Sequence, residues 1–166
     1  NDGDWFDEAN WQIGVPDTPD AGIGRPLPAF IVNGGIARIS NGEAISEYTR
    51  IRNDSHVIVD GPTASWTEFS TMTLYNGKLD IFNGASADFE RFDIRPDTFA
   101  EFNLLSGSRL DSGWTRFGNT SSDARSVIKV DGTGTFWRAD SLSLYGNTLL
   151  TISNGGSVES VNNIGL

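Results

Sequence analysis

The sequence predicts an all-β fold, a right-handed parallel β-helix of about six coils, and three observations favour it. A short run with alternating apolar residues recurs six times. An Asx-Gly or Ser-Gly turn follows each copy, and a second apolar column repeats with nearly the same period. The copies lie 20 to 26 residues apart. One strand repeated at such an interval is typical of a solenoid, in which each repeat stacks on the previous one.

Residues 1–35 lie outside the repeat and are predicted to form an N-terminal cap with a lead-in strand at 30–32. Solenoids need terminal segments that shield the last apolar layer from water. Trp5, Phe6 and Trp11 suit that task, and a stretch rich in Gly and Pro follows them. A ligand site built from exposed Trp rings is the alternative interpretation.

Residues 36–166 carry the repeat, and each copy places two apolar residues two positions apart. The second residue of each pair gives the predicted core stack: Ile39, Val59, Ile81, Leu104, Val130 and Ile152. The residue between the two is mostly polar, as at Asp80 and Lys129. This alternation predicts strands with one apolar face. Ile51 and Leu74 begin the second apolar column.

The Asn-Gly and Asp-Gly dipeptides predict the turns, because Asn, Asp and Gly adopt positive φ angles at little cost. The clearest copy of the repeat reads T-I-S-N-G-G-S-V at 151–158. The same dipeptides occur in antiparallel hairpins, but hairpins would not preserve one register across six copies. In a β-helix, equivalent side chains of neighbouring coils stack about 4.8 Å apart.

The chain opens with Trp5, Ala9-Asn10-Trp11 and Gly14-Val15-Pro16. Together with the repeat phrase, this opening resembles that of bacterial autotransporter-type β-helix passengers. The resemblance covers nearly the whole chain. It implies a right-handed parallel β-helix that is exported across the bacterial envelope and displayed or released at the cell surface. Passengers of this family usually carry many more coils than the six predicted here.

Charge and composition exclude several classes of function. The 166 residues carry a formal net charge of −10 and contain no Cys. An acidic surface repels phosphate backbones, so nucleic-acid binding is not expected. No apolar run approaches the roughly 18 residues that span a bilayer, so membrane insertion is not expected either. The lack of disulfides suits an exported bacterial protein or a cytosolic one.

Carboxylates are the main candidates for catalysis, because the single His56 has no identifiable partner for a triad and is expected on a turn surface. The acidic residues that a β-helix can gather on one face are Asp80, Asp88, Glu90, Asp93 and Asp111. Paired carboxylates hydrolyse glycosidic bonds. The short predicted connections instead favour a solvated acidic face, so we expect no catalytic residues and no enzyme.

Three aromatic residues, Trp66, Phe89 and Trp137, each lie five positions after a turn glycine. We expect them to fill a wide corner of the coil. The alternative is an exposed strip that stacks on sugar rings, and the sequence does not decide whether these rings are buried.

No cofactor is expected. Asp2, Asp4, Asp7 and Glu8 resemble a Ca²⁺ ligand set by composition only. An EF-hand loop also needs a later Gly and a later Glu, which this stretch does not supply at the required spacing.

The function expected from these features is that of a non-enzymatic, extracellular or surface-displayed bacterial module for adhesion or assembly. The alternatives are a polysaccharide-degrading β-helix enzyme and a carbohydrate-binding module, and surface glycans are candidate partners. We also expect copies of the chain to assemble head to tail into a fibre, because an open coil recruits another chain and a contact that does not close yields a filament. The predicted assembly surface comprises Trp5, Phe6, Trp11, Leu150, Ile152, Val158, Ile164 and Leu166. A fragment cut from a longer β-helix is the alternative to assembly.

Overall fold

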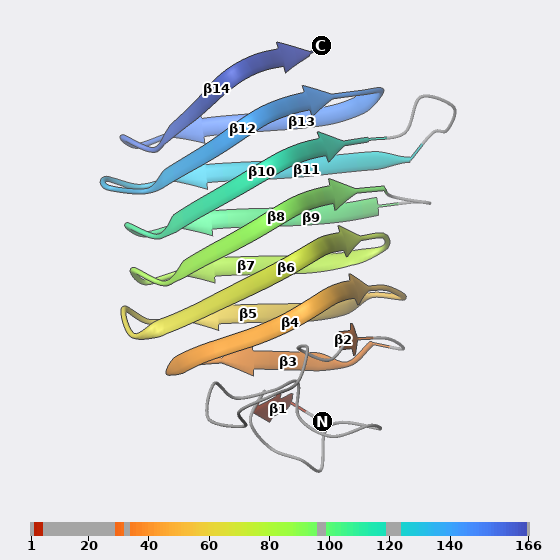
Figure 1. Ribbon diagram of the computed structural model, residues 1–166, viewed down its shortest axis with the longest axis vertical. Coiled ribbons are helices and arrows are strands. Elements are labelled where there is room, and N and C mark those ends of the chain that lie inside the picture. Colours follow the sequence, from red (N-terminus) through yellow and green to blue (C-terminus); the bar gives the residue numbers. More distant parts are fainter. Residues whose placement is uncertain (1, 5–28, 32–33, 96–98, 119–123, 166) are drawn as a thin grey trace.

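The protein is a two-sheet parallel β-solenoid of six coils (Figure 1). The computed structural model describes residues 2–4, 29–31, 34–95, 99–118 and 124–165, which contain strands and turns but no helix. The first sheet consists of β1 (Asp2–Asp4), β3 (Ile36–Ile39), β5 (Ser55–Asp60), β7 (Gly77–Phe82), β9 (Phe99–Leu105), β11 (Arg125–Asp131) and β13 (Asn147–Ser153). The second sheet consists of β2 (Ala29–Ile31), β4 (Gly42–Ile51), β6 (Ala64–Leu74), β8 (Ser86–Ile94), β10 (Arg109–Phe117), β12 (Phe136–Leu144) and β14 (Ser157–Gly165).

The chain alternates between the two sheets, so each odd-numbered strand from β3 onward forms one coil with the strand that follows it. All pairings between neighbouring coils are parallel. β1 pairs with β3 and β2 pairs with β4, so these two short strands extend both sheets below the first coil. The predicted parallel β-helix of about six coils is therefore confirmed.

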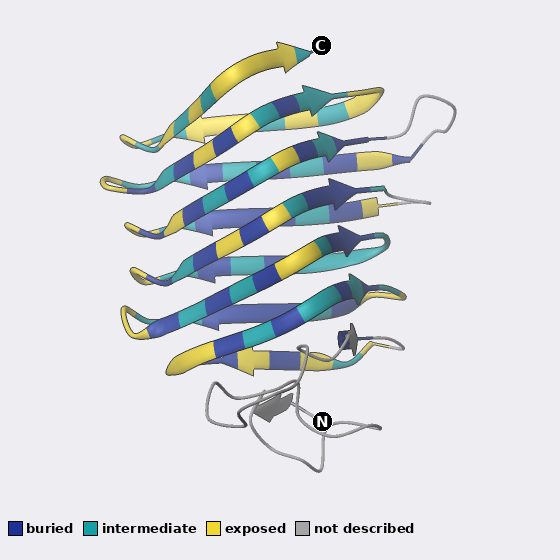
Figure 2. Cartoon of the chain, viewed as in Figure 1, coloured by how far each residue is buried: buried dark blue, intermediate teal, exposed yellow. Residues whose placement is uncertain are grey.

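The core lies between the two sheets and runs through the stack (Figure 2). Five of the six predicted core residues are fully buried: Ile39, Val59, Ile81, Leu104 and Val130. Ile152 continues their column on β13 but is 48% exposed, because no further coil covers it among the described residues.

The turns use the residues that the sequence indicated. Asn83-Gly84 and Asn154-Gly155 have positive φ angles at both positions. Each of these Asn side chains also donates a hydrogen bond to an Asp in the turn of the preceding coil. Asn83 Nδ2 lies 2.9 Å from Asp60 Oδ1, and Asn154 Nδ2 lies 2.6 Å from Asp131 Oδ1. The turn residues therefore both bend the chain and connect one coil to the next.

The aromatic residues are buried and fill the coil, as expected, but they do not form one column. Trp66, Phe89 and Trp137 have no exposed surface. The strand register places Trp66 between Ala44 and Ala87. It places Phe89 in the neighbouring column and Trp137 in the column of Trp66. The shared spacing from a turn glycine was thus misleading, because the turns differ in length.

Small residues flank Trp66 in its column, and large rings of neighbouring coils touch edge to face. Trp66 and Phe89 have centroids 5.1 Å apart at an interplanar angle of 77°. Phe89 contacts Phe92 at 5.4 Å, and Phe92 contacts Phe117 at 5.1 Å. Edge-to-face contacts stabilise aromatic pairs beyond the effect of burial alone. The aromatic residues therefore link several coils along the solenoid axis.

Outward side chains of the first sheet form hydrogen bonds and ion pairs between coils, which alternation alone did not predict. Asp80 receives hydrogen bonds from His56 Nε2 and Asn103 Nδ2, each 2.8 Å long, and Lys78 Nζ lies 3.3 Å away. Burial acts to raise the pKa of Asp80, but these partners together hold it below its ordinary value. We expected His56 on a turn, but it lies within β5. Asp80 is therefore a structural residue that ties coils together.

We predict that Ile81→Ala will lower the free energy of unfolding by about 3 kcal/mol, because Ile81 is fully buried between two coils and its loss leaves a cavity. Thr151→Ala, at an exposed position on β13, should change it by less than about 0.5 kcal/mol. Urea denaturation followed by circular dichroism measures both. Equal losses in the two variants would contradict the assignment of this column to the core.

Candidate functional site

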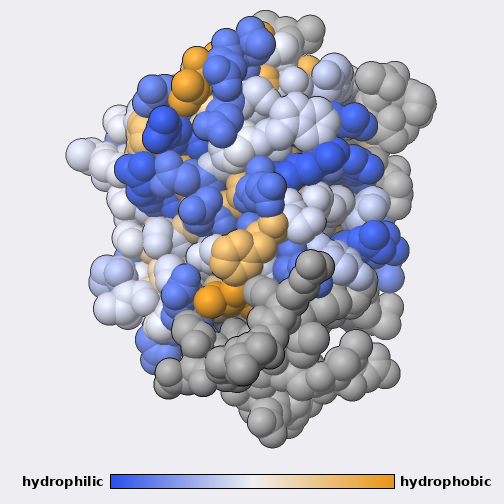
Figure 3. All heavy atoms as spheres, viewed as in Figure 1, coloured by the Kyte–Doolittle hydropathy of each residue, from blue (hydrophilic) through white to orange (hydrophobic). Residues whose placement is uncertain are grey.

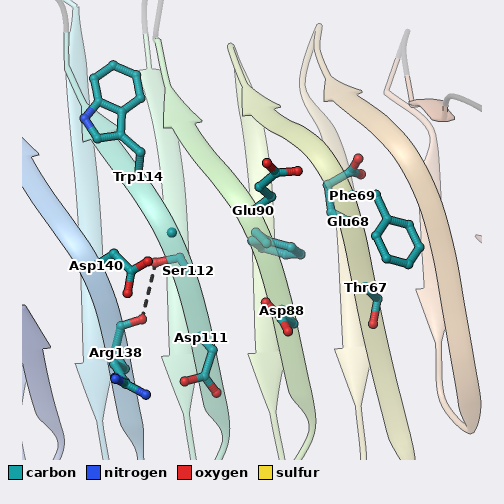
Figure 4. A pocket seen from close by; sticks show the side chains of 12 residues that line it. Thr67, Glu68, Phe69, Asp88, Glu90, Asp111, Ser112, Trp114, Arg138 and Asp140 are labelled. Atoms are coloured by element: carbon teal, nitrogen blue, oxygen red, sulfur yellow. Dashed lines mark hydrogen bonds between the residues drawn. The ribbon is translucent and has the colours of Figure 1, made fainter. Parts of the chain in front are cut away.

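The outer face of the second sheet carries an open groove of about 530 Å³ that crosses β6, β8, β10 and β12 (Figure 4). We call it the acidic groove, because five acidic residues and one arginine line it: Glu68, Asp88, Glu90, Asp111, Asp140 and Arg138. Hydrophilic side chains cover most of the described surface on this side of the molecule (Figure 3). The groove therefore presents mainly negative charge on a flat strand surface.

Strand register places the charged residues in rows across the coils. Asp88 of β8 pairs with Asp111 of β10, and Asp111 pairs with Arg138 of β12 (Figure 4). Glu90 and Asp140 lie two positions further along β8 and β12. Gly113 of β10 lies between them, and a Cβ at this position would collide with the carbonyl oxygen of Glu90. The absence of a side chain there keeps the middle of the groove open.

Two neighbouring carboxylates of the groove have different environments. Arg109 holds Asp111 from one side, with Nε and Nη2 at 2.5 and 2.9 Å from its two carboxylate oxygens. Burial and the negative charge of Asp111 both raise the pKa of Asp88. Asp88 therefore retains a proton to higher pH than an isolated Asp, while Asp111 is paired with a cation. Such a pair can accept hydrogen bonds from a ligand or exchange a proton with it.

Two exposed aromatic rings line the groove. Phe69 of β6 is 54% exposed and Trp114 of β10 is 40% exposed. Figure 4 shows the two rings on either side of Glu90. The guanidinium of Arg91 lies 4.1 Å from the centroid of the Trp114 ring and covers one of its faces. The groove thus combines hydrogen-bond acceptors with apolar surfaces.

The structure brings together only part of the predicted acidic cluster. Asp88, Glu90 and Asp111 share the groove. Asp80 lies on β7 of the opposite sheet. Asp93 lies on β8 but is only 1% exposed and is enclosed by two arginines. Asp140 was missed, because its distance from Asp88 along the chain gives no sign that they share one surface.

The exposed aromatic residues of the site were also missed. The alternative interpretation of Trp66, Phe89 and Trp137 as a sugar-stacking strip is excluded, because all three rings are buried. Phe69 faces outward because it alternates with Glu68, which is buried on the inner face of β6. Alternation that starts from the buried Trp66 also places Phe69 on the outer face, so the sequence carried a signal for this exposed ring.

A buried carboxylate lies beneath the groove. Glu68 is 1% exposed, and its Oε2 accepts hydrogen bonds from Ser46 Oγ at 2.6 Å and Thr49 Oγ1 at 2.7 Å. Ser46 Oγ in turn accepts a hydrogen bond of 2.9 Å from Trp66 Nε1. The second oxygen, Oε1, is buried and completes no hydrogen bond. Burial raises the pKa of Glu68 to about 7, and the hydrogen bonds from Ser46 and Thr49 only partly oppose this effect.

The described part of the chain contains no group of three or more His, Asp or Glu residues suited to a metal ion. The Ca²⁺ interpretation of Asp2, Asp4, Asp7 and Glu8 cannot be followed, because Asp7 and Glu8 lie outside the described residues. The same part of the chain has no helix long and apolar enough to cross a membrane.

We predict that the stability difference between the wild type and Glu68→Gln will depend on pH. The pKa of Glu68 in the folded protein, about 7, exceeds the ordinary value of 4.5, so folding favours the protonated form. That contribution is present at low pH and is lost as the pH rises from 4.5 through 7. The difference should therefore shift in favour of Gln by about 3 kcal/mol between pH 4 and pH 8.

Urea denaturation over this pH range measures the shift. Glu159→Gln is the control, because Glu159 is an exposed carboxylate on β14 of the same sheet. A stability difference for Glu68→Gln that stays constant with pH would contradict the raised pKa.

No protein-family model, curated protein or solved structure matches the chain. The resemblance to autotransporter-type passengers therefore stays a prediction from the residues that suggested it. The functional proposals depend on the chemistry of the described surface.

Proposed function

We propose that this β-solenoid is a non-enzymatic adhesive module of an exported bacterial surface protein, and that its acidic groove binds a glycan. The observation that carries the proposal is a carboxylate-lined groove with two exposed aromatic rings in its lining. Carboxylates accept short, strong hydrogen bonds from hydroxyl groups. Phe69 and Trp114 offer flat apolar surfaces for the C–H faces of sugar rings. The passenger-like opening of the sequence supports the surface location.

The construction of the groove favours binding over catalysis. All its lining residues belong to β6, β8, β10 and β12, so no loop contributes to it. A ligand held on this surface stays in contact with water, whereas closed sites strengthen the electrostatic interactions that drive catalysis. A second candidate is glycoside hydrolysis, with Asp88 as the acid and Asp111 as the partner carboxylate. The raised pKa of Asp88 beside Asp111 is the observation that favours it.

We predict that Trp114→Ala will weaken glycan binding about tenfold, which corresponds to about 1.4 kcal/mol for the loss of one stacking surface. Phe69→Ala should have a similar effect. Phe99→Ala is the matched control, because Phe99 is 45% exposed but lies on β9 of the opposite sheet. A panel of neutral oligosaccharides titrated by calorimetry measures the affinities, and circular dichroism checks folding.

Two outcomes would contradict the binding proposal. If no oligosaccharide binds the wild type, the groove is not a glycan site. If a polysaccharide is cleaved and Asp88→Asn abolishes product release, the module is a hydrolase, and the second candidate replaces the first.

We also propose that copies of the chain pack end to end. The last coil leaves apolar side chains uncovered among the described residues, with Ile152 at 48% and Ile164 at 62% exposure, while Leu150 and Val158 are half-buried. Uncovered coils also present unpaired strand edges, which recruit further strands. A further coil of a longer protein or another copy of the chain would cover them. Trp5, Phe6, Trp11 and Leu166 of the predicted assembly surface lie outside the described residues.

We predict that the 166-residue chain associates with rising concentration, and that Ile152→Lys with Ile164→Lys prevents it by placing charges on the uncovered end. Leu149→Lys is the control, because Leu149 is 47% exposed but belongs to the outward row of Val127 on the first sheet. Light scattering and electron microscopy measure association. A wild type that stays monomeric at millimolar concentration would refute the idea.

A further inference from the structure

A second hollow, of about 310 Å³, lies on the outer face of the second sheet, toward the C-terminal ends of β4, β6 and β8. We call it the arginine basin. Its main lining residues are Tyr48, Arg50, Thr71, Thr73, Arg91 and Arg95. We propose that the arginine basin binds the carboxylate of an acidic sugar, a hexuronic acid, within the glycan. This inference deepens the proposed function and rests on it.

The shape of the basin follows from the size of residues in successive coils. Thr71 of β6 pairs with Tyr48 of β4, and Thr73 pairs with Arg50. On the other side, Thr73 pairs with Asp93 of β8. Two short threonines therefore form the floor between coils that carry longer side chains. Their hydroxyl groups can donate hydrogen bonds to a ligand oxygen.

The charge of the basin contrasts with that of the protein. Three arginines and one carboxylate line it, whereas the whole chain carries a net charge of −10. The carboxylate is Asp93, and its Oδ2 accepts hydrogen bonds from Arg91 Nε at 3.2 Å and from Arg95 Nη2 at 2.6 Å. These bonds orient both guanidinium groups. Because a guanidinium has five N–H donors, Asp93 uses only part of their capacity.

A sugar carboxylate suits these groups. Arginine binds carboxylates through two parallel N–H donors. The rings of Tyr48 and Tyr75 also line the basin and can pack against a sugar ring. The basin adjoins the acidic groove, because Arg91 lines the basin and packs on Trp114, which lines the groove. One chain can therefore place neutral sugars in the groove and one acidic sugar in the basin.

The groove also limits the kind of acidic glycan. Its carboxylates repel a chain with a charge on every sugar. The proposed ligand is therefore a glycan that alternates neutral sugars with hexuronic acid, and not a continuous polyanion.

The test compares an oligosaccharide of alternating neutral sugar and hexuronic acid with its carboxyl-reduced, neutral counterpart, each titrated against the whole chain. The wild type should bind the acidic form about tenfold tighter, and added salt should reduce this preference. Arg50→Gln should remove the preference, and Thr71→Val should reduce it. Arg125→Gln is the matched control, because Arg125 is exposed on β11 of the opposite sheet and its loss changes the net charge equally.

The outcomes separate this inference from the proposed function. Equal binding of both oligosaccharides by the wild type would overturn the inference and leave a glycan site in the groove. A preference that Arg125→Gln removes as strongly as Arg50→Gln would also overturn it, because net charge alone would explain the effect. If the acidic form binds through Arg50 while Trp114→Ala has no effect, the basin is supported and the groove is not.

Discussion

The whole structure depends on parallel pairing in register between successive coils. Each side chain lies about 4.8 Å from its equivalent in the coils above and below, so its size and charge must suit both neighbours. Trp66 is accommodated because Ala44 and Ala87 flank it in its column. The next large ring, Phe89, then occupies the adjacent column. Trp66 and Phe89, which belong to neighbouring coils, therefore lie in different columns of the interior.

The same constraint governs charge. Where coils meet, opposite or hydrogen-bonding groups usually face each other, as with Arg38 and Asp60 at 3.2 Å. Asp88 and Asp111 break this rule, because two carboxylates on adjacent strands repel each other. Residues that violate such local rules are often found at functional sites. The unfavourable pair is therefore itself an argument that this surface serves a ligand.

Glu68 shows a related conflict inside the solenoid. A buried carboxylate destabilises the folded state when it is ionised, and hydrogen bonds from the Ser46 and Thr49 hydroxyl groups compensate this only in part. Its position beneath the acidic groove places a titratable group close to the proposed binding surface. The second sheet therefore concentrates its unusual electrostatics on one side of the molecule. The arginine basin extends this pattern with the opposite sign along the same face.

The sequence by itself determined the solenoid, its coil number and most of its core, because these depend on residues that repeat at a fixed interval. Ile81 and Val130 could be assigned to the interior from alternation alone. The candidate surface was decided only by the tertiary structure. Asp140 joins Asp88 because β8, β10 and β12, which are separate in sequence, stack in one sheet. Local alternation carries no information about which coils lie together, so the ligand surface emerges only when the coils are stacked.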